Sequence, residues 1–157
     1  MSEPASPNPP ADELDAALQE FAGVARRLQD ETEAVNNRIA RCEQVLVALN
    51  PGFPMFGADL HMTPIQDNLA NGADFLFTKH QDEWGLWIRR GKFRKVEGTW
   101  RFVPDDAASK ILPLLDGTRS ERATANAYLK KLVEDITAKA RLSLEELGAA
   151  LKKKSER

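Results

Sequence analysis

The sequence has few of the features that would identify a function class directly. A single cysteine, Cys42, occurs in 157 residues, so no disulfide can form within the chain, which suits a reducing compartment. No apolar run reaches the roughly 18 residues that a membrane span requires, and no basic segment followed by a hydrophobic one opens the chain. We therefore expect a cytoplasmic protein without a membrane partner.

Motifs for catalysis or metal binding are lacking too. His61 and His80 each lie two residues from an aspartate, but neither spacing matches a zinc signature, and two histidines cannot supply a typical zinc site alone. No phosphate-binding loop, nucleophile elbow or dinucleotide fingerprint occurs. The sequence predicts a protein that is not an enzyme and takes no metal or cofactor. A site assembled from scattered residues, such as His61, His80 and Asp82, is the weaker alternative.

The chain does have a long apolar seam near its N-terminus. Eleven residues follow one another at alternating spacings of four and three, which is typical of a heptad repeat. They are Leu14, Leu18, Phe21, Ala25, Leu28, Thr32, Val35, Ile39, Cys42, Leu46 and Leu49. We predict a helix over residues 12–50, about 57 Å long at the usual rise per residue, which ends where Pro51 and Gly52 disfavour helix.

The regions on either side of this seam differ in composition. Residues 1–11 hold four prolines with small polar residues and predict a disordered leader. Residues 51–73 contain too many large apolar side chains for a solvated linker, so they should form a connector that docks on the rest of the chain. Within it, Thr63-Pro64-Ile65-Gln66 is typical of a capping box with proline at the first helical position, which predicts one short helix.

From Asp74 onward the pattern changes to short runs of aromatic and β-branched residues. Turn signals at 81–83, Gly91 and Gly98 separate these runs and predict an antiparallel meander of three or four strands. A short helix capped by Asp105 or Asp106 should follow, completing residues 74–117. Residues 118–157 have apolar side chains at a helical period and predict a C-terminal helix, which a capping box at 143–146 could divide near Leu142. The predicted fold class is therefore α+β.

Positive charge is concentrated in the predicted meander, although the whole chain carries a net charge of −2. Residues 84–103 hold six basic residues and one acidic residue, interleaved with Trp87, Phe93 and Trp100. The basic residues are Arg89, Arg90, Lys92, Arg94, Lys95 and Arg101. Cations for phosphates beside aromatic platforms for bases are typical of nucleic-acid-binding proteins. A solvated sheet face whose charges protect an edge strand, or a surface for an acidic protein partner, accounts for the same residues.

The length of the seam supports the leading functional hypothesis. An unbroken C-terminal helix over residues 119–142 would be about 36 Å long, which leaves about 20 Å of the seam without a partner in its own chain. We expect a second copy, in a homo-oligomer, or another helical protein to cover the seam. The interface residues would be Leu14, Leu18, Phe21, Leu28, Val35, Ile39 and Leu46. The protein is then a non-enzymatic interaction subunit or adaptor, and the alternative is a nucleic-acid-binding module that uses residues 84–103.

Overall fold

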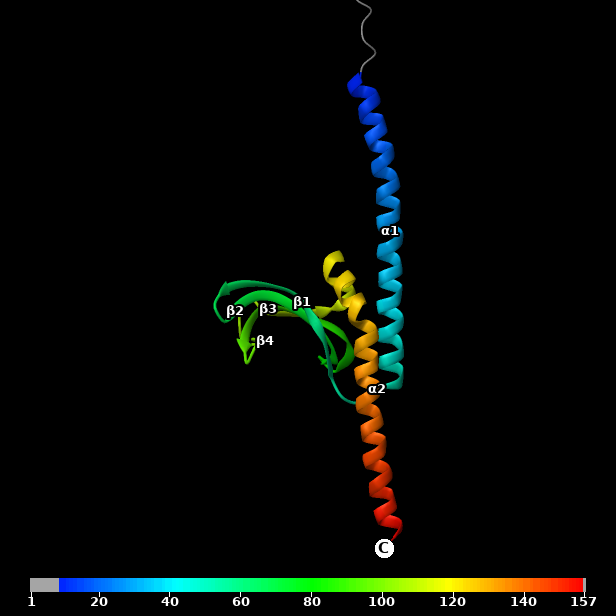
Figure 1. The fold of residues 1–157 in the computed structure, drawn as a ribbon, viewed down its shortest axis with the longest axis vertical. Helices are drawn as coiled ribbons and strands as arrows, with labels where there is room; N and C mark the ends of the chain where they lie inside the picture. The colour runs from blue at the N-terminus through cyan, green and yellow to red at the C-terminus, as the bar shows by residue number, and fades with distance from the viewer. Residues whose placement is uncertain (1–8, 157) are drawn as a thin grey trace, which may run out of the picture. The chain divides into compact units, whose positions relative to one another are not determined.

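The computed structural model describes residues 9–156 and confirms an α+β fold (Figure 1). In chain order the elements are α1 (Pro9–Leu49), β1 (Met55–Gln66), β2 (Leu69–His80), β3 (Glu83–Val96), β4 (Thr99–Phe102), β5 (Lys110–Pro113), the 3-10 turn η1 (Leu114–Asp116) and α2 (Arg119–Ser155). The chain divides into two compact units, one up to Ala34 and one from Val35 onward. Residues 1–8 of the expected leader lie outside the described residues, and 9–11 belong to α1. None of the helices in the described range is long and apolar enough to cross a membrane.

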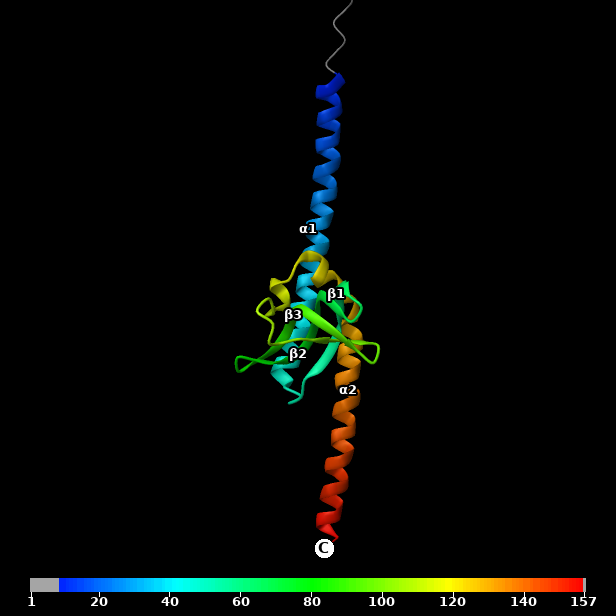
Figure 2. The ribbon, with the colours of Figure 1, turned by 90° about the vertical axis from the view of Figure 1, so that its left-hand side faces the viewer.

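The strands form one antiparallel sheet with the order β1-β2-β3-β4, and β5 also pairs with β3. On one side, β2 pairs with β3 along most of its length. On the other side, β4 pairs with Phe93–Val96 and β5 with Trp87–Arg90. Figures 1 and 2 show that the sheet is strongly arched and that α2 stands against it.

The hydrophobic core lies between one face of the sheet and the two helices. Phe75 and Phe77 of β2 and Leu86 and Ile88 of β3 are fully buried there. The register explains this burial, because Phe77 lies opposite Leu86 and Phe75 opposite Ile88, so that all four side chains share a face. The helices add Ile39, Leu46, Ala125, Leu129, Leu132 and Ile136 to the same cluster.

The prediction of a short helix from Thr63 is wrong, because this segment belongs to the hairpin of β1 and β2. Pro64 lies on β1, an edge strand, where a missing backbone N–H is tolerated. Pairing between β2 and β3 continues as far as Leu69 with Arg94. This pairing places Ala70 in a fully buried position, so long-range strand pairing outweighs the local capping signal.

The helix predicted after Asp105 or Asp106 is wrong as well. Residues Lys110–Pro113 form β5, which fills the stretch of the β3 edge that β4 does not reach, and only the turn η1 follows. Pro113 fits an edge strand better than a helix interior, where it would remove a hydrogen bond. Asp106 shapes the preceding loop instead, since its Oδ1 accepts from the Ala108 N–H at 2.8 Å.

The meander does not break at Gly91, and the C-terminal helix does not divide near Leu142. Gly91 lies inside β3 with a φ of +151°, and a side chain at this position would meet the Ser109 Cα at 2.9 Å. The glycine therefore lets the strand bend rather than end. Similarly, α2 continues through Leu142, because the Ser143 hydroxyl donates to the Lys139 carbonyl at 3.2 Å instead of capping a new helix.

The C-terminal part of the predicted interface belongs to the chain's own core. Ile39 is fully buried, Leu46 is nearly so, and Val35 packs against the same cluster. This corrects the expectation that Ile39 and Leu46 contact another chain. The physical reason is that core residues of α2 and the sheet already pack against this part of α1.

Truncation of Ile39 to alanine should lower the free energy of unfolding by about 2–4 kcal/mol, because it removes buried methylenes and leaves a cavity. Val47→Ala, at an exposed position of the same helix, should change it by less than about 1 kcal/mol. Denaturant unfolding followed by circular dichroism measures both values. Equal losses in the two variants would contradict the assignment of Ile39 to the core.

Candidate functional site

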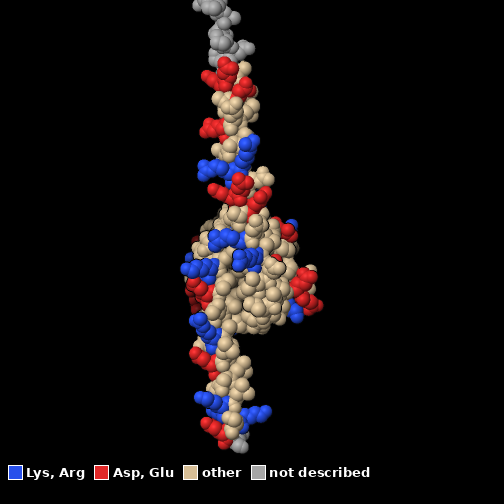
Figure 3. Space-filling model, turned by 90° about the vertical axis from the view of Figure 1, so that its right-hand side faces the viewer, with Lys and Arg blue, Asp and Glu red and all other residues tan. Residues whose placement is uncertain are grey.

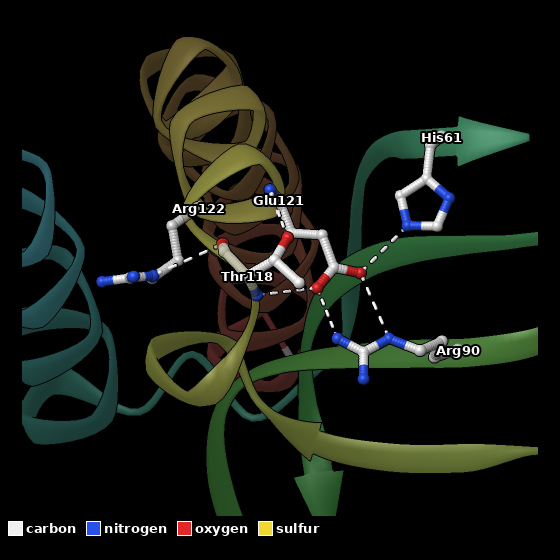
Figure 4. Close-up of polar contacts among 5 residues, drawn as sticks. All are labelled: His61, Arg90, Thr118, Glu121 and Arg122. Carbon is white, nitrogen blue, oxygen red and sulfur yellow. Dashed lines mark hydrogen bonds and ion pairs between the residues drawn. The ribbon is translucent and has the colours of Figure 1, made fainter. Parts of the chain in front are cut away.

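The carboxylate of Glu121, in the first turn of α2, is buried where α2 meets the sheet (Figure 4). Arg90 of β3 donates to it twice, from Nη2 to Oε1 and from Nε to Oε2 at 3.3 Å. His61 of β1 places Nε2 at 3.0 Å from Oε2, and the Thr118 backbone N–H donates to Oε1 at 2.8 Å. Groups from two strands and the helix N-cap thus satisfy one buried charge.

The local sequence explains why a carboxylate lies at this position. The Thr118 hydroxyl accepts from the Glu121 backbone N–H at 3.1 Å, and the Glu121 side chain accepts from the Thr118 N–H in return. This reciprocal capping box requires a threonine and a glutamate three residues apart. The spacing can be read in the sequence, but we did not predict a capping box at Thr118. The contacts with Arg90 and His61 depend on strand register, which the spacing does not reveal.

The surroundings of Glu121 keep its carboxyl group ionised. Burial acts to raise the pKa, but hydrogen bonds from Arg90, Thr118 and His61, with the Arg90 charge, outweigh it and lower the pKa from 4.5 to about 2. Glu121 is therefore a carboxylate at neutral pH and carries no proton to donate.

The same cluster extends to α1 through the next residue of α2. Arg122 donates from Nη1 to the Asn36 Oδ1 of α1, and its Nε lies 3.4 Å from the Thr118 carbonyl oxygen. A second polar contact joins α1 to the sheet, since Glu43 Oε2 accepts from the Leu86 backbone N–H at 2.7 Å. These contacts attach residues 35–49 of α1 to α2 and to the sheet.

The cluster does not assemble the parts of a nucleophilic catalytic site. His61 is half exposed, and its side-chain hydrogen bond within the described range goes to Glu121 rather than to a hydroxyl or thiol. His61 pairs with Ala73, seven residues before His80 on β2, so the two histidines lie about 23 Å apart along the sheet. The structure therefore does not bring His61 to His80 and Asp82. Among residues 9–156, no group of three His, Cys, Asp or Glu side chains is placed to hold a metal.

Three of the six predicted anion-binding residues pair with carboxylates of the same chain. Arg90 is held by Glu121, as described above. Arg89 donates to Asp74 from Nε at 2.9 Å and from Nη2 at 2.6 Å. Lys92 Nζ lies 3.3 Å from an Asp106 oxygen. These charges are largely neutralised within the fold.

The Asp74–Arg89 pair lies on the sheet face opposite the core. Asp74 alternates with the core residues Ala73 and Phe75 along β2, and it is itself fully buried. Burial raises the pKa of Asp74 more than the hydrogen bonds and charge of Arg89 lower it. The Arg89 guanidinium also lies 5.2 Å from the Phe102 ring centroid, so this arginine ties β2 to β4 across the sheet.

The other three basic residues, Arg94, Lys95 and Arg101, are exposed at the free end of the sheet. Arg94 of β3 lies directly opposite Arg101 of β4, an arrangement of like charges that is destabilising without a counter-ion. Lys95 Nζ lies 5.5 Å from the Trp100 ring centroid. Three basic side chains and the Trp100 ring therefore lie together at this end of β3 and β4, which we call the sheet tip.

The upper part of α1 exposes large apolar side chains. We call Leu14, Leu18, Phe21, Val24 and Leu28 the N-terminal stripe; their exposed fractions are 58, 53, 68, 58 and 43%. Residues 12–33, which contain the stripe, hold seven acidic and two basic side chains. Figure 3 shows the predominance of acidic groups on this segment. Four of these five residues are in the predicted interface, and Val24 lies beside it.

A second exposed stripe lies on α2, where sequence analysis assigned no interface. Figures 1 and 2 show α2 continuing past the end of α1. We call Leu144, Leu147 and Leu151 the C-terminal stripe; they share one helical face and are 68, 62 and 68% exposed. Residues 137–155 hold five basic and two acidic side chains.

A groove of about 530 Å³ lies between residues 38–46 of α1 and 129–134 of α2. Cys42, Val45 and Val133 contribute to its apolar lining, and Arg38 lines it as well. Burial raises the pKa of the Cys42 thiol, and the charge of the adjacent Glu43 raises it further. Cys42 is therefore not an activated nucleophile.

Comparison with known proteins finds no matching family model, no matching curated protein and no matching solved structure.

Replacement of Glu121 by glutamine should lower the free energy of unfolding at pH 7 by about 1.5–3 kcal/mol, since it weakens the charge-assisted hydrogen bonds from Arg90, whose side chain is 37% exposed. Glu134→Gln, at an exposed pair with Lys130, should cost less than about 1 kcal/mol.

The stabilisation by the Glu121 carboxylate depends on pH. Because the native pKa of Glu121 is lowered to about 2 from 4.5, its stabilisation is complete above pH 4.5 and is lost as pH falls toward 2. The difference in unfolding free energy between wild type and Glu121→Gln should therefore shrink over that range. A constant difference would show that the charge of Glu121 does not contribute.

Proposed function

We propose that this chain is a non-enzymatic interaction subunit that self-associates through its helical ends. The observation that supports the proposal is the N-terminal stripe, in which large apolar side chains on one helix are 43–68% exposed. Contiguous apolar surface of this kind marks interaction sites on proteins in water.

Coverage of the stripe would stabilise the helix that carries it. Most helical stability comes from packing of an apolar face, and complete burial of one leucine or phenylalanine side chain contributes about 1.5–3 kcal/mol. Between residues 11 and 34, every side chain is exposed except Ala25 and Thr32, which are partly buried. Packing within this unit therefore does not cover the stripe.

A second copy of the chain is favoured over a different protein because each copy carries two such surfaces. The C-terminal stripe offers a further apolar helical face, and the heptad spacing of the N-terminal stripe is typical of helices that pair along their length. Self-association can thus satisfy both surfaces with one kind of subunit.

We also propose nucleic-acid binding as a second candidate function, supported by one specific observation. Arg94 and Arg101 face each other across β3 and β4, next to Lys95 and Trp100. A phosphate between the two arginines would relieve their repulsion. The pairing of Arg89, Arg90 and Lys92 with carboxylates limits this surface to the sheet tip and makes it the weaker candidate.

Light scattering on a size-exclusion column should give the wild-type chain a mass that is a multiple of 17.5 kDa and that persists at high salt. Leu18→Glu with Phe21→Glu should shift the protein toward monomer, because both charges would be buried at the interface. The matched control is Ala16→Glu with Gln19→Glu, which adds the same charge to the other side of α1 and should keep the wild-type mass. Monomeric wild-type protein would contradict the proposed function.

Titration with single-stranded RNA at increasing salt tests the second candidate. Arg94→Gln with Arg101→Gln should weaken binding and reduce the slope of log affinity against log salt by about 1.4, at about 0.7 per lost phosphate contact. Lys79→Gln with Lys110→Gln, at exposed positions of β2 and β5, is the control with the same charge change and should leave the slope unchanged. No binding at low salt would exclude this function for the RNA tested.

A further inference from the structure

We propose that the N-terminal stripe of one copy packs antiparallel against the C-terminal stripe of a second copy. This inference rests on the self-association proposed above and names the surfaces that meet. It joins residues 18–33 of α1 to residues 139–154 of α2, two exposed helical segments of about 24 Å each. Both have apolar side chains at spacings of three and four, as helices that pair along their length require.

The two segments carry complementary patterns of charge. Along α1 the order is acidic, basic, acidic: Asp12, Glu13, Asp15 and Glu20, then Arg26 and Arg27, then Asp30, Glu31 and Glu33. Along α2 the order is basic, acidic, basic: Lys139 and Arg141, then Glu145 and Glu146, then Lys152, Lys153 and Lys154. Pairing of two N-terminal segments would place like charges together, as would pairing of two C-terminal segments. The mixed pair is therefore electrostatically favoured.

One antiparallel register satisfies the apolar and the charged residues together. If Phe21 lies across from Leu151, then Ala25 lies across from Leu147 and Leu28 from Leu144. The same register sets the basic block 26–27 across from Glu146 and Glu145, and the acidic block 30–33 across from Arg141 and Lys139. In the parallel register that pairs Phe21 with Leu144, residues 26–27 fall across from Ala149 and Ala150. The parallel register that instead sets residues 26–27 across from Glu145 and Glu146 places Phe21 across from Ala140. Charge and apolar contact together therefore favour the antiparallel direction.

Each chain gives one segment and receives the other, so one kind of contact covers both stripes of every copy. The contact ends before the groove between α1 and α2, because Val35 and Ile39 of the same seam pack in the chain's own core.

Single cysteines on the two stripes test this register in the full-length chain. On a Cys42→Ser background, chains with Phe21→Cys or Leu28→Cys are mixed with chains carrying Leu144→Cys or Leu151→Cys, and disulfide products are identified by mass. Phe21→Cys should link to Leu151→Cys, and Leu28→Cys to Leu144→Cys, several-fold faster than in the two crossed mixtures. Ala149→Cys, on the other side of α2 from Leu147, is the control and should link slowly. Far-UV circular dichroism checks that each variant folds.

Each other outcome overturns the inference in a different way. Faster linking in the crossed mixtures would establish a parallel register, and dominant linking of Phe21→Cys to itself would establish pairing of two N-terminal segments. Both results would leave self-association intact. A monomeric wild-type chain would overturn the proposed function together with this inference.

Charge exchange gives an independent readout. Arg26→Glu with Arg27→Glu should reduce the associated fraction at low salt, and adding Glu145→Lys with Glu146→Lys should restore it. A loss that the second pair does not rescue would show that the two blocks do not face each other.

Discussion

The buried carboxylate of Glu121 is the interaction on which the fold of residues 35–156 depends. A charge that is only 2% exposed stays ionised because Arg90, His61 and the Thr118 N–H all reach it. These groups come from β3, β1 and the N-cap of α2, so the carboxylate fixes where α2 begins on the sheet. Arg122, the next residue, donates to Asn36 and so joins α1 to the start of α2.

The position of α2 determines which apolar residues are covered and which are not. From its start to Ile136, α2 packs on the sheet and on α1, and α1 contributes residues from Val35 onward. Both helices continue beyond these limits with the same apolar periodicity, but their side chains there are exposed. On the sheet, by contrast, Arg89 and Arg90 already have acidic partners. The chain thus leaves two apolar helical stripes uncovered, beside the exposed Arg94, Lys95 and Arg101.

Signals that act within one turn of chain were readable from the sequence, whereas those that depend on distant pairing were not. The end of α1 at Leu49 was predicted from the proline and glycine that follow it. Thr63 carried an equally local capping signal, yet its segment became a strand because β2 pairs with β3 over a long register. The Glu121 site combines a local and a long-range signal. The spacing of Thr118 and Glu121 can be read from the sequence, whereas the contact with Arg90 depends on the fold. Heptad spacing likewise could not show that Ile39 is core and Leu18 is exposed.

Amide hydrogen exchange as a function of protein concentration tests most directly whether a second copy covers the helical ends. If a second copy covers these ends, protection of residues 18–33 and 139–154 rises together as concentration increases from micromolar to millimolar, while protection of the core strands β2 and β3 stays constant. Rapid exchange of both segments at every concentration, with the core protected throughout, would contradict it. That result would mean that the exposed stripes are not an interface between copies of this chain.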